Sequence, residues 1–213
     1  MPGLMKKDYI FLLGRPGCGK SFVYETIIKK LKETEKIEKV ERVDDFPILK
    51  ELLDKDTEFK RHLRKEGGFE VTDFTIVDEV LSTIDSRLEG VKSKNDLVFI
   101  EFARADYISA LKNFSPATFA RSMIVYIYCP YEVCLARNRK RFEQQKNNAF
   151  DDHIVPTDLM ESYYKNDDIE KLFLSKRSEL DKVMPGDFFV IDNASEGIEA
   201  LIGQFDALIK ELK

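Results

Sequence analysis

Short apolar runs alternate with longer amphipathic stretches along this 213-residue chain, and this pattern predicts strands that alternate with helices. Five segments have the length and composition of strands: 9–13, 39–43, 97–102, 123–128 and 188–191. The run at 97–102 is apolar on both of its faces, as a central strand of a parallel sheet requires. We therefore expect a sheet that is covered by helices on both sides.

Between these runs, apolar residues recur at helical spacing. Helices are expected at 21–35, 46–65, 73–88, 107–113, 130–146, 159–183 and 196–212. Gly67-Gly68 separates the second of these helices from the third, and the polar segment 144–152 is expected to be loose. Repeated strand–helix units predict a single α/β domain with a five-stranded parallel sheet between helices.

Charge and composition narrow the classes of function. The net charge of −5 gives the chain no electrostatic reason to bind nucleic acid, so we do not expect a nucleic-acid partner. No run of 18 apolar residues occurs, and residues 1–7 lack the apolar stretch of a signal peptide. The three cysteines cannot all pair, which favours a reducing compartment. We expect a cytoplasmic protein without a membrane partner, as a monomer or homodimer.

A phosphate-binding motif lies between the first expected strand and the first expected helix. Its residues follow the pattern G-x-x-x-x-G-K-S: Gly14, Arg15, Pro16, Gly17, Cys18, Gly19, Lys20 and Ser21. Glycines let the backbone N–H groups converge on an anion, and the following helix adds its positive N-terminal end. Lys20 is expected at the β- and γ-phosphates of ATP, and the Ser21 hydroxyl at Mg²⁺. The alternative is a glycine-rich turn without a ligand.

Acidic residues follow two of the expected strands. Asp44 and Asp45 end the second strand, which we expect to lie beside the first, and one of them is a candidate base for an acceptor hydroxyl. Asp45 is favoured because it lies deeper in the turn, although an acid before Phe46-Pro47 also suits a helix N-cap. Glu101 stands in an apolar strand, where it either approaches Mg²⁺ or pairs with Arg104.

Two basic clusters are candidate anion sites. Arg137 and Arg141 are four residues apart, so they share one face of a helix, and we expect them to contact the triphosphate. Their neighbours Arg139 and Lys140 are expected at a solvated face. Arg64, in a second cluster before Gly67-Gly68, is a candidate contact for an anionic acceptor, but a solvated helix face is the stronger interpretation there.

Together these segments resemble the P-loop kinases of small metabolites, which include adenylate, gluconate, shikimate and zeta-toxin-type kinases. The resemblance rests on 14–21, on the acid at 44 or 45, on 126–141 and on 189–195. It implies an ATP- and Mg²⁺-dependent phosphotransferase with a helical acceptor-binding insertion at 46–94 and a mobile lid at 137–158. It also implies that Asn193 and Ala194 lie in the loop that cradles adenine. Glu101-Phe102-Ala103-Arg104 departs from the sequences usual there, so Arg104 is only a candidate acceptor contact.

Two other functions remain open on the sequence alone. One is an ATPase or nucleotide-dependent switch that needs no small-molecule acceptor, although the guanine-recognition sequence Asn-Lys-x-Asp is absent. The other is a nucleotide-binding module that acts on RNA ends, for which the basic run at 137–141 is the only support. The acceptor, whether a small molecule or a nucleotide, is not identified by any motif.

Overall fold

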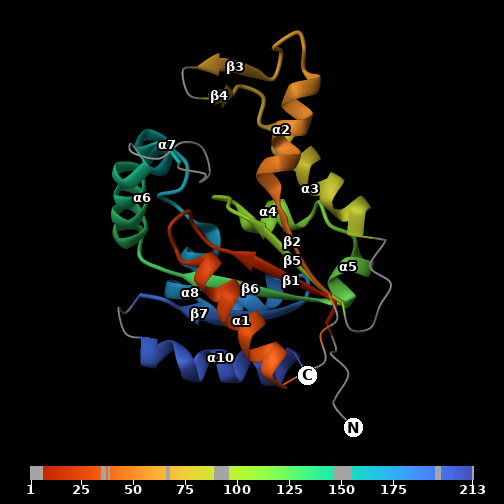
Figure 1. The fold of residues 1–213 in the computed structure, drawn as a ribbon, viewed down its shortest axis with the longest axis vertical. Coiled ribbons are helices and arrows are strands. Elements are labelled where there is room, and N and C mark those ends of the chain that lie inside the picture. Colours follow the sequence, from red (N-terminus) through yellow and green to blue (C-terminus); the bar gives the residue numbers. More distant parts are fainter. Residues whose placement is uncertain are drawn as a thin grey trace.

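The computed structural model describes residues 7–34, 37, 39–65, 68–88, 96–145, 155–194 and 198–212. At its centre is a parallel sheet of five strands in the order β2-β5-β1-β6-β7 (Figure 1). These strands are β1 (Tyr9–Leu13), β2 (Lys39–Asp44), β5 (Asp96–Phe102), β6 (Ser122–Tyr128) and β7 (Asp187–Asp192). The expected α/β fold with a five-stranded parallel sheet between helices is confirmed.

Helices cover both faces of this sheet. Those of the described ranges are α1 (Lys20–Thr34), α2 (Asp45–Lys55), α3 (Thr75–Leu88), α4 (Tyr107–Leu111), α5 (Pro116–Ala120), α6 (Tyr131–Gln145), α7 (Thr157–Ser162), α8 (Asp168–Ser175), α9 (Arg177–Val183) and α10 (Ile198–Leu212). Within the described ranges, none of these helices combines the length and the apolar character that a membrane crossing needs.

Alternate residues of β1 enter two hydrophobic cores, one on each face of the sheet. Ile10 and Leu12 belong to the core that contains the apolar residues of α1 and α10. Tyr9, Phe11 and Leu13 belong to the core that contains those of α3, α4 and α5. Because both faces are covered, every residue of β1 is buried, and the strand is a continuous apolar run.

The expectation that the second strand lies beside the first is wrong, because β5 lies between β1 and β2. Glu101 of β5 is in register with Leu12 of β1 on one side and with Asp44 of β2 on the other. The ends of the three strands are therefore aligned. Glu101 lies between the loop that follows β1 and the acids at the end of β2.

The expected helix at 46–65 is also wrong beyond Lys55, so the insertion at 46–94 is not wholly helical. The chain there forms an antiparallel hairpin of β3 (His62–Lys65) and β4 (Gly68–Val71), which projects beyond α2 (Figure 1). Asp56 explains the stop, because its carboxylate accepts hydrogen bonds from the backbone N–H groups of Lys60 and Arg61. Side-chain bonds of this kind compete with the helical hydrogen-bond pattern.

The expected helix at 159–183 is divided into α7, α8 and α9. The break before α8 is stabilised by Asp167, which has extended backbone angles and accepts a hydrogen bond from the backbone N–H of Glu170. Asp167 is thus an N-cap, which begins a new helix. Of the lid expected at 137–158, residues 146–154 lie outside the described residues, as do residues 66–67 and 89–94 of the insertion.

Candidate active site

The phosphate loop, residues 14–21, connects β1 to α1 and has a backbone that only glycine adopts easily. Gly17 and Gly19 have positive φ angles of 85° and 104°. A Cβ atom at Gly17 would lie 2.6 Å from the carbonyl oxygen of Cys134, and one at Gly19 would lie 2.7 Å from Nδ2 of Asn193. Because these two positions carry no side chain, the loop packs directly against α6 and against the residue that follows β7.

The Lys20 ammonium group lies over this loop. Its Nζ donates hydrogen bonds to the carbonyl oxygens of Gly14 at 2.8 Å and Arg15 at 3.1 Å. Ser21 follows in the first turn of α1 and is exposed. A positive side chain, a helix N-terminus and a glycine-rich backbone turn thus meet at one place, an arrangement that attracts phosphate groups.

Two buried side chains hold the loop in place by hydrogen bonds to its backbone. The backbone N–H of Gly14 donates to the hydroxyl of Tyr107 at 2.9 Å, and Asn193 Nδ2 donates to the carbonyl oxygen of Cys18 at 2.7 Å. The Asn193 amide is buried and committed to this bond, so it positions the loop. The next residue, Ala194, donates its backbone N–H to Asp192 Oδ1. The expectation that Asn193 and Ala194 lie in a loop that binds adenine stays a prediction.

Arg15 belongs to the phosphate-loop motif, but its side chain points into the protein and is 1% exposed. Its Nε donates to the carbonyl oxygen of Tyr164 at 2.6 Å, and its Nη2 donates to that of Lys165 at 3.1 Å. The guanidinium also forms an ion pair with Glu170 of α8. Arg15 therefore joins the phosphate loop to the segment between α7 and α8. The half-buried Pro16 follows it in the loop.

Asp44 and Asp45 have different partners. Asp44 is the N-cap of α2, since its Oδ1 accepts a hydrogen bond from the backbone N–H of Phe46 at 2.9 Å. Our suggestion that Asp45 suits the cap is therefore wrong. Asp45 is the first residue of α2, and its carboxylate forms an ion pair with Arg104 at 2.7 Å.

The environment of the Asp45–Arg104 pair changes the acidity of both groups. Burial raises the pKa of Asp45, and the positive charge of Arg104 offsets only part of this rise. Burial is the largest single influence on Arg104 and lowers its pKa, but the charge and hydrogen bond of Asp45 together with Tyr164 and Tyr163 outweigh it, so the pKa of Arg104 is raised. Arg104 therefore stays positive, beside a carboxylate whose affinity for a proton is increased.

Glu101 pairs with Arg42 of β2, so the suggested ion pair between Glu101 and Arg104 is wrong. The Arg42 Nη2 and Nε atoms lie 2.6 Å and 2.9 Å from the same carboxylate oxygen of Glu101. No pattern in the sequence had assigned a role to Arg42. The only hint in the sequence was its position two residues before Asp44, the acid at the end of β2. In a strand where charged and apolar residues alternate, however, such an arginine is normally expected to face solvent.

The basic residues considered as anion contacts, two for the triphosphate and one for the acceptor, lie in different places. Arg137 of α6 is half-buried, and its Nη1 lies 3.5 Å from the carbonyl oxygen of Gly17 and 3.4 Å from Cys129 Sγ. Arg141, one turn further along α6, is exposed. Arg64 is exposed on β3, with its guanidinium over the ring of Phe59 at 4.7 Å. The structure therefore brings Arg137 to the phosphate loop and places Arg64 on the hairpin.

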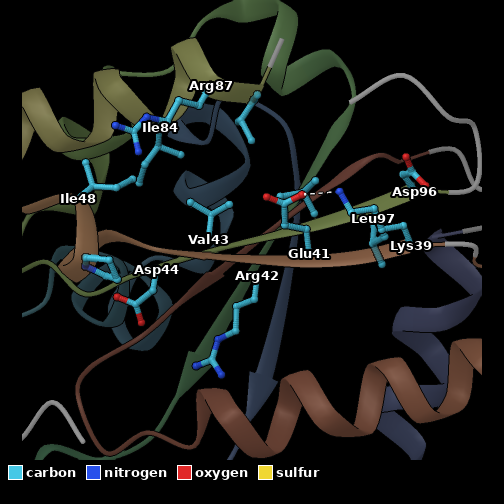
Figure 2. Close-up of a pocket in the computed structure, with 13 residues that line it drawn as sticks. Lys39, Glu41, Arg42, Val43, Asp44, Ile48, Ile84, Arg87, Asp96 and Leu97 are labelled. Carbon is cyan, nitrogen blue, oxygen red and sulfur yellow. Dashed lines mark hydrogen bonds and ion pairs between the residues drawn. The ribbon is translucent and has the colours of Figure 1, made fainter. Parts of the chain in front are cut away.

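A pocket on the outer side of β2 includes Arg42 and Asp44 but not the phosphate loop (Figure 2). It is lined by β2 together with residues of α2 and α3, among them Val43, Ile48 and Ile84. None of the residues 14–21 lines it. The candidate active site is defined instead by the charged residues at the strand ends, from Lys20 in the phosphate loop to Asp45 and Arg104.

The residues around Ser21 suit a magnesium ion that is shared with a nucleotide. Among the described residues, no group of three or more His, Cys, Asp or Glu side chains could hold a metal alone. The Ser21 hydroxyl and the Glu101 carboxylate both lie beside the Arg42 guanidinium, at 3.5 Å and 2.6 Å from its Nη2. Mg²⁺ prefers such oxygen ligands and completes its shell with water and substrate phosphates.

Known proteins were compared with the chain by sequence and by structure. No family model matches, and no curated protein matches the sequence. Solved structures do match over nearly the whole chain. A gluconokinase from Sinorhizobium meliloti 1021 has a TM-score of 0.53 and 13% identity, and the match covers 99% of this chain and 97% of that one. A sugar kinase from Janibacter sp. HTCC2649 has a TM-score of 0.50 and 13% identity, with 95% of each chain covered.

A third match is Kti12 from Chaetomium thermophilum in complex with ADP-AlF3, with a TM-score of 0.54 and 15% identity. It covers 96% of this chain and 99% of that one. At these identities the likeness establishes the fold. The chain has the fold of the P-loop kinases, and the resemblance inferred from the sequence is confirmed at that level.

Proposed function

We propose that the protein is an ATP-dependent phosphotransferase, which moves the γ-phosphoryl group of ATP to a hydroxyl group of a small molecule or nucleotide. The observation that carries this proposal is that two sets of charged side chains lie at the carboxyl ends of three neighbouring strands. Lys20 lies over the phosphate loop after β1, and the Asp45–Arg104 pair lies after β2 and β5. In open parallel sheets, ligands bind beyond the carboxyl ends of the strands.

The phosphate-loop amides, Lys20 and Arg137 supply the positive charge that phosphoryl transfer needs. During in-line transfer, charge spreads over the equatorial oxygens of the γ-phosphoryl group, and fixed donors stabilise that charge. Arg141 is proposed as a further contact from the same face of α6. Mg²⁺, held by Ser21 and the phosphates with Glu101 nearby, would neutralise charge on the β- and γ-phosphate oxygens.

Asp45 is proposed to orient the acceptor hydroxyl and to accept its proton. The bond from the acceptor oxygen to the γ-phosphorus forms as the bond from that phosphorus to the β–γ bridging oxygen breaks, and ADP leaves. The raised pKa of Asp45 suits this role, because a base works best when its pKa approaches the working pH. Arg104 is proposed to contact the acceptor. Arg64 lies on β3, so it can contact the acceptor only when the β3–β4 hairpin approaches it.

The acceptor is proposed to be a hydroxylated metabolite, because the site offers a carboxylate and a guanidinium as hydrogen-bond partners. The matched gluconokinase and sugar kinase support this class through their shared fold. The test is a coupled assay for ADP production with ATP, Mg²⁺ and a panel of sugars, sugar acids, nucleosides and nucleotides. Turnover that depends on one acceptor supports the proposal. Hydrolysis of ATP that no acceptor stimulates would favour an ATPase instead.

A further inference from the structure

Arg42 holds a position in the candidate active site that the proposed phosphoryl transfer does not use. Both Nε and Nη2 of its guanidinium donate to one oxygen of Glu101, and Nη2 lies 3.5 Å from Ser21 Oγ. The guanidinium also lies over the ring of Tyr24, 5.0 Å from its centroid. Figure 2 shows Arg42 and Glu41 pointing to opposite sides of β2, with Arg42 directed toward α1.

The need for Arg42 follows from the burial of Glu101. The Glu101 side chain is only 10% exposed, and its neighbours in β5 from Leu97 to Phe102 are all apolar. A carboxylate in such a place is costly unless a positive charge compensates it. Arg42 supplies that charge, and its own side chain is 32% exposed. About a third of the Arg42 side chain is thus already in contact with solvent.

The two candidate magnesium ligands, Ser21 and Glu101, thus face one guanidinium. A metal ion between them would be a second cation near the same carboxylate, and the two positive charges would repel each other. We propose that Arg42 is a stand-in cation: it neutralises Glu101 while no metal is present, and the arriving metal must displace it. Arg42 then lowers the affinity of the nucleotide complex for its metal. This inference rests on the proposed function.

The proposal predicts two effects of opposite sign for Arg42→Met. Without metal, the variant unfolds at a lower temperature, because Glu101 loses its counter-charge. With ADP bound, it binds Mn²⁺ roughly five- to tenfold more tightly, since a partly exposed ion pair no longer competes. Damage to the fold alone would weaken both properties. A direct contact between Arg42 and phosphate would instead lower the affinity for ADP.

The experiment titrates Mn²⁺ into full-length protein at saturating ADP, with free Mn²⁺ followed by electron paramagnetic resonance. Arg42→Gln is the second variant, because its amide can still donate to Glu101 and preserve the fold. Lys39→Met is the matched control, since it removes an exposed cation from the same strand, where Lys39 pairs with Glu41. We expect tighter Mn²⁺ binding in both Arg42 variants and unchanged binding in the control.

Unchanged or weaker Mn²⁺ binding in the Arg42 variants, with ADP still bound, would overturn the role of Arg42 and leave the proposed function standing. Failure of the wild-type protein to bind ADP would contradict the proposed function itself, and the inference with it. Equal tightening in Lys39→Met would assign the effect to general charge and would also overturn the proposal.

Discussion

At the scale of single residues, the proposed chemistry depends on a distinction between two neighbouring aspartates. Asp45 faces Arg104, whereas Asp44 caps α2. Asp45→Asn removes the proton acceptor but keeps a polar side chain of the same size, so we expect a loss of transfer of at least about 100-fold. ATP affinity should change little. The measurement is acceptor-dependent ADP release, together with calorimetry of ATP binding.

Asp44→Asn is the matched control for Asp45→Asn, because asparagine also caps helices well. It should retain transfer and stability close to those of the wild type. If transfer survives in Asp45→Asn, or is lost equally in both variants, Asp45 is not the group that accepts the proton.

Asp167 gives the folded protein a titration near neutral pH. Its carboxylate accepts a hydrogen bond from Tyr126 at 2.9 Å, and burial raises its pKa to about 7 despite the bond from the Glu170 N–H and the charge of Arg15. The folded state thus holds this proton more tightly than the unfolded state, whose carboxyl has an ordinary pKa. Stability from this group is present at low pH and is lost as the pH rises toward about 7.

Asp167→Asn should therefore flatten the pH dependence of stability. The contribution to be removed is at most about 1.4 kcal/mol per pH unit over this window. Urea unfolding of wild-type and variant protein at pH 5, 6 and 7 measures it. If the two proteins lose stability in parallel as the pH rises, Asp167 does not titrate there.

The sequence predicted the phosphate loop at the residue level because that motif is local, with every member within eight positions. It did not predict the partners of the buried charges. Glu101 pairs with Arg42 and Asp45 with Arg104, both across 59 positions. Such pairs depend on which strands are neighbours, and a linear pattern does not specify that.

At the scale of secondary-structure elements, two glycines have opposite expected effects. Gly17→Ala would force a residue with a Cβ into a φ of 85° and against Cys134, so it should reduce both stability and ATP binding. Gly203 lies exposed within α10, and a Cβ there would meet no atom within 4 Å. Gly203→Ala should raise the free energy of unfolding by about 0.5–1 kcal/mol, because alanine favours helix.

Thermal and urea unfolding of both glycine variants, with calorimetry of ATP binding, test this contrast. Equal stability changes in the two variants would contradict the conformation described for the phosphate loop. Wild-type ATP affinity in Gly17→Ala would contradict the role of that loop in binding.

The strands were predicted more accurately than the helices, for a physical reason. The central strands β1, β5 and β6 are buried and apolar on both faces, which makes them distinct in sequence. All five strands of the parallel sheet were predicted within one residue of their bounds, whereas the short hairpin strands β3 and β4 were not predicted. The expected helices at 46–65 and 159–183 were too long. Charged residues at helical spacing concealed the end of α2 at Asp56 and the new start of α8 at Asp167, where the aspartate side chains accept hydrogen bonds from backbone N–H groups.

At the scale of the whole molecule, the order of the strands determines what the site can do. Because β5 lies between β1 and β2, Glu101 and Arg104 stand between the phosphate loop and the acids at 44 and 45. Apolar patterning predicts a parallel sheet but does not order its strands, so the expected position of β2 beside β1 was wrong. The candidate nucleotide and acceptor groups are consequently separated by the width of one strand rather than adjacent.

Isothermal titration calorimetry of Mg²⁺-ATP tests most directly whether this arrangement holds a triphosphate. Wild-type protein should bind with measurable heat, and Lys20→Ala should bind about 100-fold more weakly, because it loses a charged donor to the phosphates. Lys39→Ala, on the outer edge of the sheet, should bind like the wild type. The absence of heat with every nucleoside triphosphate, or equal affinity in wild type and Lys20→Ala, would contradict the account.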